Sequence, residues 1–143
     1  MPVITYDVRL AGDPMALVAT FAHELAHYLC STFHGEPPGG KEMDEPATDL
    51  TAVFIGFGVF LANSAFTFQQ YSSATRTGWR ARTQGYLPEL QLLNAMAIFC
   101  SLSGAPWRDA LPHLDAHLRP LLKRLVKELD GWTELLAPLR VGS

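Results

Sequence analysis

Two histidines with a glutamate between them stand in FAHELAHYLC, residues 21–30, a segment that is otherwise almost entirely apolar. His23 and His27 are four residues apart, so on a helix they lie one turn apart on one face, and both imidazoles can reach one ion. Glu24 is expected to point toward a water molecule on that ion. This H-E-x-x-H arrangement predicts two zinc ligands and a general base. It also explains an isolated carboxylate in an apolar segment, which is costly to bury without a partner.

A hydrolytic zinc site uses three protein ligands and leaves one position open, so a third ligand must come from elsewhere in the chain. Glu45, in DEPATDL, is the candidate, and Asp49 lies four residues later on the same helical face. Asp49 could accept a hydrogen bond from the far nitrogen of a ligand histidine and fix its tautomer. The plainer alternatives are a solvated helix face for the histidine motif and compensation of the helix dipole for the two acids.

Two packed helices are needed to bring these side chains together. Residues 14–33 are expected to form the first helix, because Asp13 is a good N-cap and Pro14 suits the first helical position. Residues 34–43, HGEPPGGKEM, are expected to be a loop because of their proline and glycine content. A second helix is expected to begin at residue 44 or 45 and to continue to about residue 70.

The remaining segments complete a mostly α domain with at most a small N-terminal β element. Residues 3–9, VITYDVR, alternate in polarity and predict one short strand. Residues 88–103 predict a third helix, and Pro112 and Pro120 predict broken helices after it. Gly131 is expected to end the last of these. One side of that last helix is an apolar stripe: Leu118, Leu121, Leu122, Leu125, Val126 and Leu129.

The composition indicates one cytoplasmic domain over residues 1–143. A chain of 143 residues with 48% hydrophobic residues can form one substantial core. The net charge of −3 gives no support for nucleic-acid binding. Cys30 and Cys100 both lie in apolar helical segments and are expected to be buried free thiols. The N-terminus does not have the pattern of a signal peptide.

Residues 51–70, TAVFIGFGVFLANSAFTFQQ, carry no charge over a length near that of a membrane span. However, they include Asn63, Ser64, Thr67 and two glycines, and no basic residues flank them closely. A buried central helix is therefore favoured over a membrane-embedded one.

H-E-x-x-H on one helix followed by E-x-x-x-D on the next resembles the gluzincin metallopeptidases, the thermolysin-like class. The resemblance covers roughly residues 14–60. It implies a zincin-like core, with His23, His27 and Glu45 as zinc ligands and Glu24 as the base that activates water. It also implies that Asp49 supports a ligand histidine.

The sequence departs from the gluzincin pattern in two respects. Gluzincins have a β-sheet before the motif helix, and its edge strand holds the substrate, whereas here residues 3–9 could supply only one strand. Gluzincins also use a tyrosine or histidine to stabilise the tetrahedral intermediate, for which His34, Tyr71 and Tyr86 are candidates. The chain could be a minimal peptidase, a fragment of a longer one, or a metal-binding relic.

Zinc-dependent hydrolysis of a peptide or protein substrate is the function these residues predict best. Zinc would lower the pKa of a water molecule and polarise the carbonyl, and Glu24 would transfer the proton to the leaving amine. One alternative is a zinc-stabilised structural or regulatory domain without turnover. Another is a membrane-associated gluzincin of the prenyl-protein-processing kind, which would require residues 51–70 to face lipid.

Several other patterns have simpler interpretations. His113 and His117, in HLDAH, are also four apart, but they lack the glutamate and lie near prolines, which favours a surface helix. The GFG at residues 56–58 predicts close helix packing. The arginines of the linker are expected to be solvated: Arg76, Arg80 and Arg82. A group of phenylalanines is expected to lie in the core: Phe54, Phe57, Phe60, Phe66 and Phe68.

Overall fold

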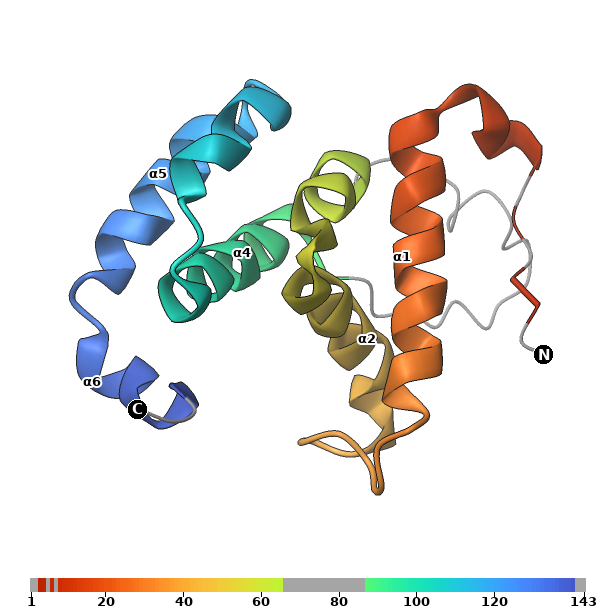
Figure 1. Ribbon diagram of the computed structural model, residues 1–143, viewed down its shortest axis with the longest axis horizontal. Helices are drawn as coiled ribbons and strands as arrows, with labels where there is room; N and C mark the ends of the chain where they lie inside the picture. Colours follow the sequence, from red (N-terminus) through yellow and green to blue (C-terminus); the bar gives the residue numbers. More distant parts are fainter. Residues whose placement is uncertain (1–2, 5, 7, 66–86, 141–143) are drawn as a thin grey trace.

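The computed structural model describes residues 3–4, 6, 8–65 and 87–140, and these are mostly helical, as the sequence predicts. In Figure 1, α1 and α2 lie side by side in one half of the molecule, and α5 and α6 lie in the other. Helix α4 lies between the two halves and packs against both α2 and α5. The elements are η1 (Val8–Gly12), α1 (Pro14–Cys30), η2 (Lys41–Met43), α2 (Asp44–Ala52), η3 (Val53–Phe57), the helical residues 58–65, α4 (Glu89–Ser103), η4 (Trp107–His113), α5 (Leu118–Leu129), α6 (Thr133–Leu136) and η5 (Ala137–Leu139).

The predicted N-terminal strand is not found in the described part of the chain. Val8 and Arg9 belong to the 3-10 helix η1, and none of the described residues is in a strand. A single strand has no neighbour to satisfy its backbone groups, whereas a 3-10 turn bonds within itself. The η1 turn leads directly into the cap of α1, where Asp13 accepts a 3.0 Å hydrogen bond from the backbone N–H of Ala16.

Helix α1 packs through small side chains. Its buried positions are four alanines and His23, so the backbones of α1 and α2 can approach closely and His23 faces the second helix. The helix ends at Cys30, three residues before the predicted end at Phe33. The hydroxyls of Ser31 and Thr32 bond back to main-chain carbonyls three residues earlier, each at 2.6 Å, and the chain turns away.

The second predicted helix is broken rather than continuous. After α2 the chain is π-helical, and Gly56 has φ 102° and ψ 6°, which is not a helical conformation. A residue with a side chain would be strained there. Gly58 is packed closely, because a Cβ at this position would lie 2.5 Å from Cγ of Met96. The GFG segment thus makes a kink as well as the predicted close contact.

The segment Lys41–Ala65 is apolar and long enough to cross a membrane, by length and composition only. Its most apolar window is 44% buried within the protein, and a core helix of a soluble protein meets the same criteria. Residues 66–70 lie outside the described part of the chain, as do Arg76, Arg80 and Arg82.

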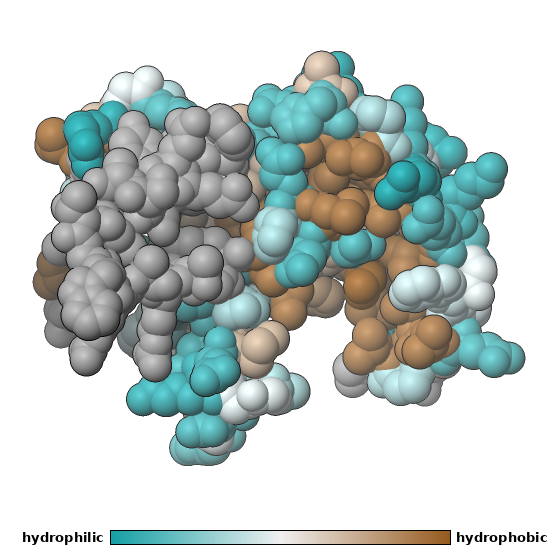
Figure 2. Space-filling view, turned by 180° about the vertical axis from the view of Figure 1, so that it is seen from behind, coloured by the Kyte–Doolittle hydropathy of each residue, from teal (hydrophilic) through white to brown (hydrophobic). Residues whose placement is uncertain are grey.

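Most of the apolar core lies where α4 packs against α5 and residues 58–65. The apolar stripe of α5 faces the core: four of its leucines are buried, and Leu121 and Val126 are partly buried. Each fully buried leucine stabilises the fold by about 1.5–3 kcal/mol. Helix α4 ends at Gly104, which has a left-handed conformation with φ 74°. Pro112 lies within η4 and Pro120 within the first turn of α5, so the helices here are broken as expected. Seen from behind, this half of the molecule also shows apolar side chains at the surface (Figure 2).

The phenylalanine and cysteine predictions are correct only in part. Phe57 and Phe60 pack against the core, but Phe54 is 43% exposed, and Phe66 and Phe68 lie outside the described residues. Phe54 lies in η3, just after α2, and packs edge-on against Phe99. Both cysteines are free thiols, but they are half-buried rather than buried.

Candidate metal centre

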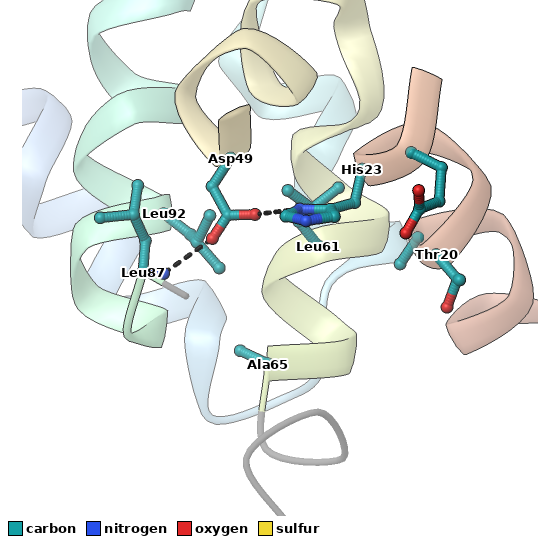
Figure 3. A pocket seen from close by; sticks show the side chains of 9 residues that line it. Thr20, His23, Asp49, Leu61, Ala65, Leu87 and Leu92 are labelled. Atoms are coloured by element: carbon teal, nitrogen blue, oxygen red, sulfur yellow. Dashed lines mark hydrogen bonds and ion pairs between the residues drawn. The ribbon is translucent and has the colours of Figure 1, made fainter. Parts of the chain in front are cut away.

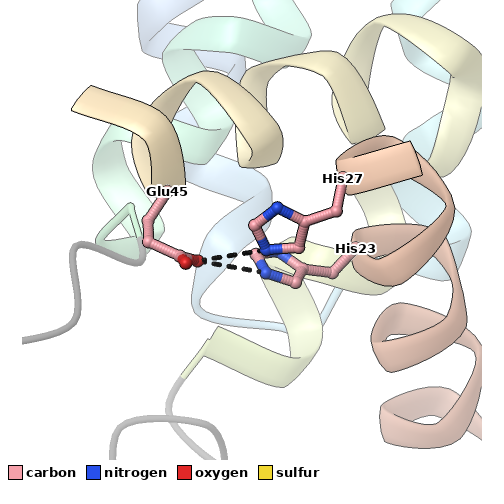
Figure 4. Close-up of side chains that lie close together, drawn as sticks. All are labelled: His23, His27 and Glu45. Atoms are coloured by element: carbon pink, nitrogen blue, oxygen red, sulfur yellow. Dashed lines mark ion pairs between the residues drawn. The ribbon is translucent and has the colours of Figure 1, made fainter. Parts of the chain in front are cut away.

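Helices α1 and α2 bring His23, His27 and Glu45 together. Their potential ligand atoms all lie within 4.8 Å of one another, and no other group of three or more such residues occurs in the described residues. One oxygen of Glu45 lies 3.2 Å from Nε2 of His23 and 3.5 Å from Nε2 of His27. Figure 4 shows the two imidazoles, one turn apart on α1, facing this carboxylate on α2. The three residues can therefore hold one metal ion.

The distances from Glu45 to the two histidines suit a tetrahedral ion. Zinc binds histidine nitrogens and carboxylate oxygens at about 2.0–2.2 Å, so two of its tetrahedral ligand atoms lie roughly 3.3 Å apart. The two distances from Glu45 to the histidines, 3.2 and 3.5 Å, lie on either side of that value. Two imidazoles and one carboxylate also leave a fourth position for a water molecule.

Asp49 supports His23 from the interior. Its side chain is 5% exposed, and Oδ1 lies 2.9 Å from Nδ1 of His23. The other oxygen, Oδ2, accepts a 2.7 Å hydrogen bond from the backbone N–H of Leu87, just before α4 (Figure 3). Asp49 thus uses one carboxylate oxygen to orient His23 and the other to hold the chain at the entry to α4. Nε2 of His23 is left facing Glu45.

The charges around His23 favour its protonated form when no metal is bound. Burial opposes the charge, but the hydrogen bond to Asp49 and the negative charges of Asp49, Glu45 and Glu24 outweigh it, and the pKa of His23 is raised. A proton on Nε2 would occupy the nitrogen that a metal needs. A metal at this atom would therefore compete with a proton, so acid would weaken its binding.

Glu24 lies beside the cluster rather than in it. With His23 and Asp49 it lines a small cavity of about 40 Å³, which has room for water. It is half-buried and forms no hydrogen bond or ion pair with another described residue. The structure thus places a carboxylate next to a ligand histidine at a space that water can enter.

Thr48 is a site residue that the sequence reasoning missed. It is 1% exposed, and its hydroxyl lies 3.2 Å from Nδ1 of His27. The sequence did contain a signal, because Thr48 comes three residues after Glu45 and one before Asp49, so all three share one face of α2. A threonine is an ordinary helix residue, however, and only the packing of α1 shows which side chain it meets.

A larger groove adjoins the cluster at His27 and Glu45. It has a volume of about 630 Å³ and runs between the end of α1 and the start of α2. His27 and Glu45 line it, and so does His34, one of the three candidates for stabilising a tetrahedral intermediate. The other two, Tyr71 and Tyr86, lie outside the described residues.

Comparisons with protein-family models, with curated proteins and with solved structures found no match. A functional interpretation therefore depends on the geometry of the α1–α2 cluster and on the chemistry of its side chains.

Proposed function

We propose that this protein is a zinc-dependent peptidase whose zinc ligands are His23, His27 and Glu45. The observation that supports this most strongly is the convergence of three donor atoms from two helices, within 4.8 Å, beside a carboxylate that is not needed as a ligand. The H-E-x-x-H motif requires that carboxylate, Glu24, as its general base.

Each residue then has a defined task. Zinc, when bound, supplies Lewis-acid chemistry to a water molecule and to the substrate carbonyl. Glu24 accepts the proton of the attacking water and passes it to the leaving amine. Asp49 orients His23. His34, in the adjoining groove, is the candidate for stabilising the tetrahedral intermediate among the described residues.

The 630 Å³ groove supports a peptide as the substrate class. It is open, it adjoins two of the three proposed ligands, and its lining combines apolar side chains with polar and acidic ones. An extended chain lying in it would bring a backbone carbonyl past Glu45 and His27.

A structural metal site is the second candidate, and it too has a supporting observation. None of the described residues forms the edge strand that holds the substrate in gluzincins. A metal would then serve to join α1 to α2 across the loop of residues 31–40 and would contribute folding energy. A structural site has no use for Glu24, so this residue separates the two functions.

The test is the Glu24→Gln substitution in zinc-loaded protein. Glutamine has nearly the same shape but cannot accept the proton, so we expect cleavage of a mixed peptide library to fall by roughly 10²- to 10⁴-fold with zinc retained. Glu89→Gln, which replaces another half-buried glutamate beside a histidine, is the matched control and should cleave normally. Absence of wild-type cleavage, together with a raised thermal midpoint in Glu24→Gln, would favour the structural site, since burying a carboxylate is costly.

A further inference from the structure

The hydroxyl of Thr48 contacts two groups at once. It donates a 2.8 Å hydrogen bond to the backbone carbonyl of Asp44, one turn earlier in α2, and it lies 3.2 Å from Nδ1 of His27. Two neighbouring threonines make the same bond to the carbonyl four residues earlier, Thr20 in α1 and Thr51 in α2. A hydrogen bond from the hydroxyl to the carbonyl four residues earlier is common for threonine inside a helix.

The single hydroxyl proton determines which nitrogen of His27 is protonated. Since Thr48 gives its proton to the carbonyl of Asp44, only its oxygen lone pairs are available to His27. If Nδ1 of His27 carried no proton, its lone pair would face a lone pair of the Thr48 oxygen at 3.2 Å. If Nδ1 carried the proton, it would donate a hydrogen bond to that oxygen. The competing acceptor at Nε2 is the Glu45 oxygen, which is farther away at 3.5 Å and lies closer to Nε2 of His23. The shorter contact with Thr48 therefore favours neutral His27 with its proton on Nδ1. Its Nε2 is left with a lone pair directed toward Glu45.

We propose that Thr48 is the positioning residue of His27, and that it holds this imidazole in the Nδ1–H tautomer required of a metal ligand. This inference rests on the proposed metal site for its purpose, but the tautomer itself is a property of the metal-free protein. Asp49 and Thr48, adjacent on α2, thus each accept a proton from Nδ1 of a histidine on α1, one through a carboxylate and the other through a neutral hydroxyl.

The experiment uses Thr48→Val, which keeps the branched shape and removes the hydroxyl, and Thr48→Ser, which restores it. Thr51→Val is the matched control, because Thr51 makes the same carbonyl bond one turn later but faces Cys30 instead of a histidine. The first readout is the ¹⁵N NMR spectrum of the imidazoles in metal-free protein, at a pH where His27 is neutral. The second readout is zinc affinity.

We expect Nδ1–H at His27 in the wild type, in Thr48→Ser and in Thr51→Val, and loss of that preference in Thr48→Val. Zinc affinity should fall by roughly 10- to 100-fold in Thr48→Val alone, the usual effect of losing a hydrogen-bond partner of a ligand. An Nε2–H tautomer in the wild type would overturn the proposal even if no variant folds. So would a Thr48→Val spectrum that matches the wild type.

The two readouts also separate this inference from the proposed function. If the tautomer changes as expected but the wild type binds no zinc, Thr48 still positions His27 and the zinc peptidase is wrong. If zinc binds and the tautomer does not depend on Thr48, the metal site stands and this inference is wrong.

Discussion

Two pairs of histidines in this chain have the same spacing, and only one pair belongs to a group that could hold a metal ion. His23 and His27 lie on one continuous helix and face one carboxylate. His113 ends η4, while His117 precedes α5, and the extended residue Leu114 lies between them. A separation of four residues places two side chains on one face only if every residue between them is helical.

The surroundings of the two pairs differ as much as their backbones do. The side chain of His23 is 8% exposed and has carboxylates at both nitrogens. The side chain of His117 is 60% exposed and has a single contact at 3.4 Å, with Glu89. Exposed pairs of this kind contribute little, because water competes for both partners. The turn between His113 and His117 is stabilised by the side chain of Asn63. Its amide nitrogen donates to the backbone carbonyl of His113, and its oxygen accepts from the backbone N–H of Asp115.

Replacing one carboxylate by its amide at each pair sharpens this comparison. Asp49→Asn should weaken zinc binding by roughly 10- to 100-fold. The side-chain amide of asparagine has one acceptor oxygen, so it cannot accept hydrogen bonds from both Nδ1 of His23 and the backbone N–H of Leu87. Glu89→Gln makes the same change beside His117 and should leave zinc affinity unchanged. Isothermal titration with zinc measures both. Equal affinities in Asp49→Asn and the wild type would show that Asp49 only holds the chain near Leu87.

A smaller effect is expected in the groove beside His27. Ser31 lines this groove, whereas its neighbour Thr32 does not, and both hydroxyls make the same 2.6 Å bond to a main-chain carbonyl. Ser31→Trp should therefore raise the KM for peptide cleavage several-fold with unchanged zinc content, while Thr32→Trp should not. If the two variants have the same KM, the substrate does not pass through this groove.

The sequence predicted those features that depend on local pattern. Helical spacing placed His23 and His27 on one face, and the order of acids in DEPATDL placed Glu45 and Asp49 on the helix that meets them. The apolar stripe of α5 and the end of α4 at Gly104 were predicted in the same way.

The features that escaped prediction depend on contacts between distant segments. In the sequence, Gly56 is an ordinary glycine within an apolar segment that predicts one continuous helix. In the structure it has a positive φ and forms the kink between α2 and residues 58–65. Residues 3–9 had the alternation of a strand, but the described part of the chain contains no strand for them to pair with. The role of Thr48 depends on the orientation of His27, on another helix.

Zinc binding by the two histidine pairs tests the central claim most directly. Equilibrium dialysis followed by metal analysis would be run on the wild type, on the double variant His23→Ala/His27→Ala, and on the double variant His113→Ala/His117→Ala, with circular dichroism to verify helix content. We expect about one zinc per chain in the wild type and in the His113/His117 variant, and almost none in the His23/His27 variant. Zinc retained by a folded His23→Ala/His27→Ala protein, or absent from the wild type, would contradict the claim that α1 and α2 form a metal site.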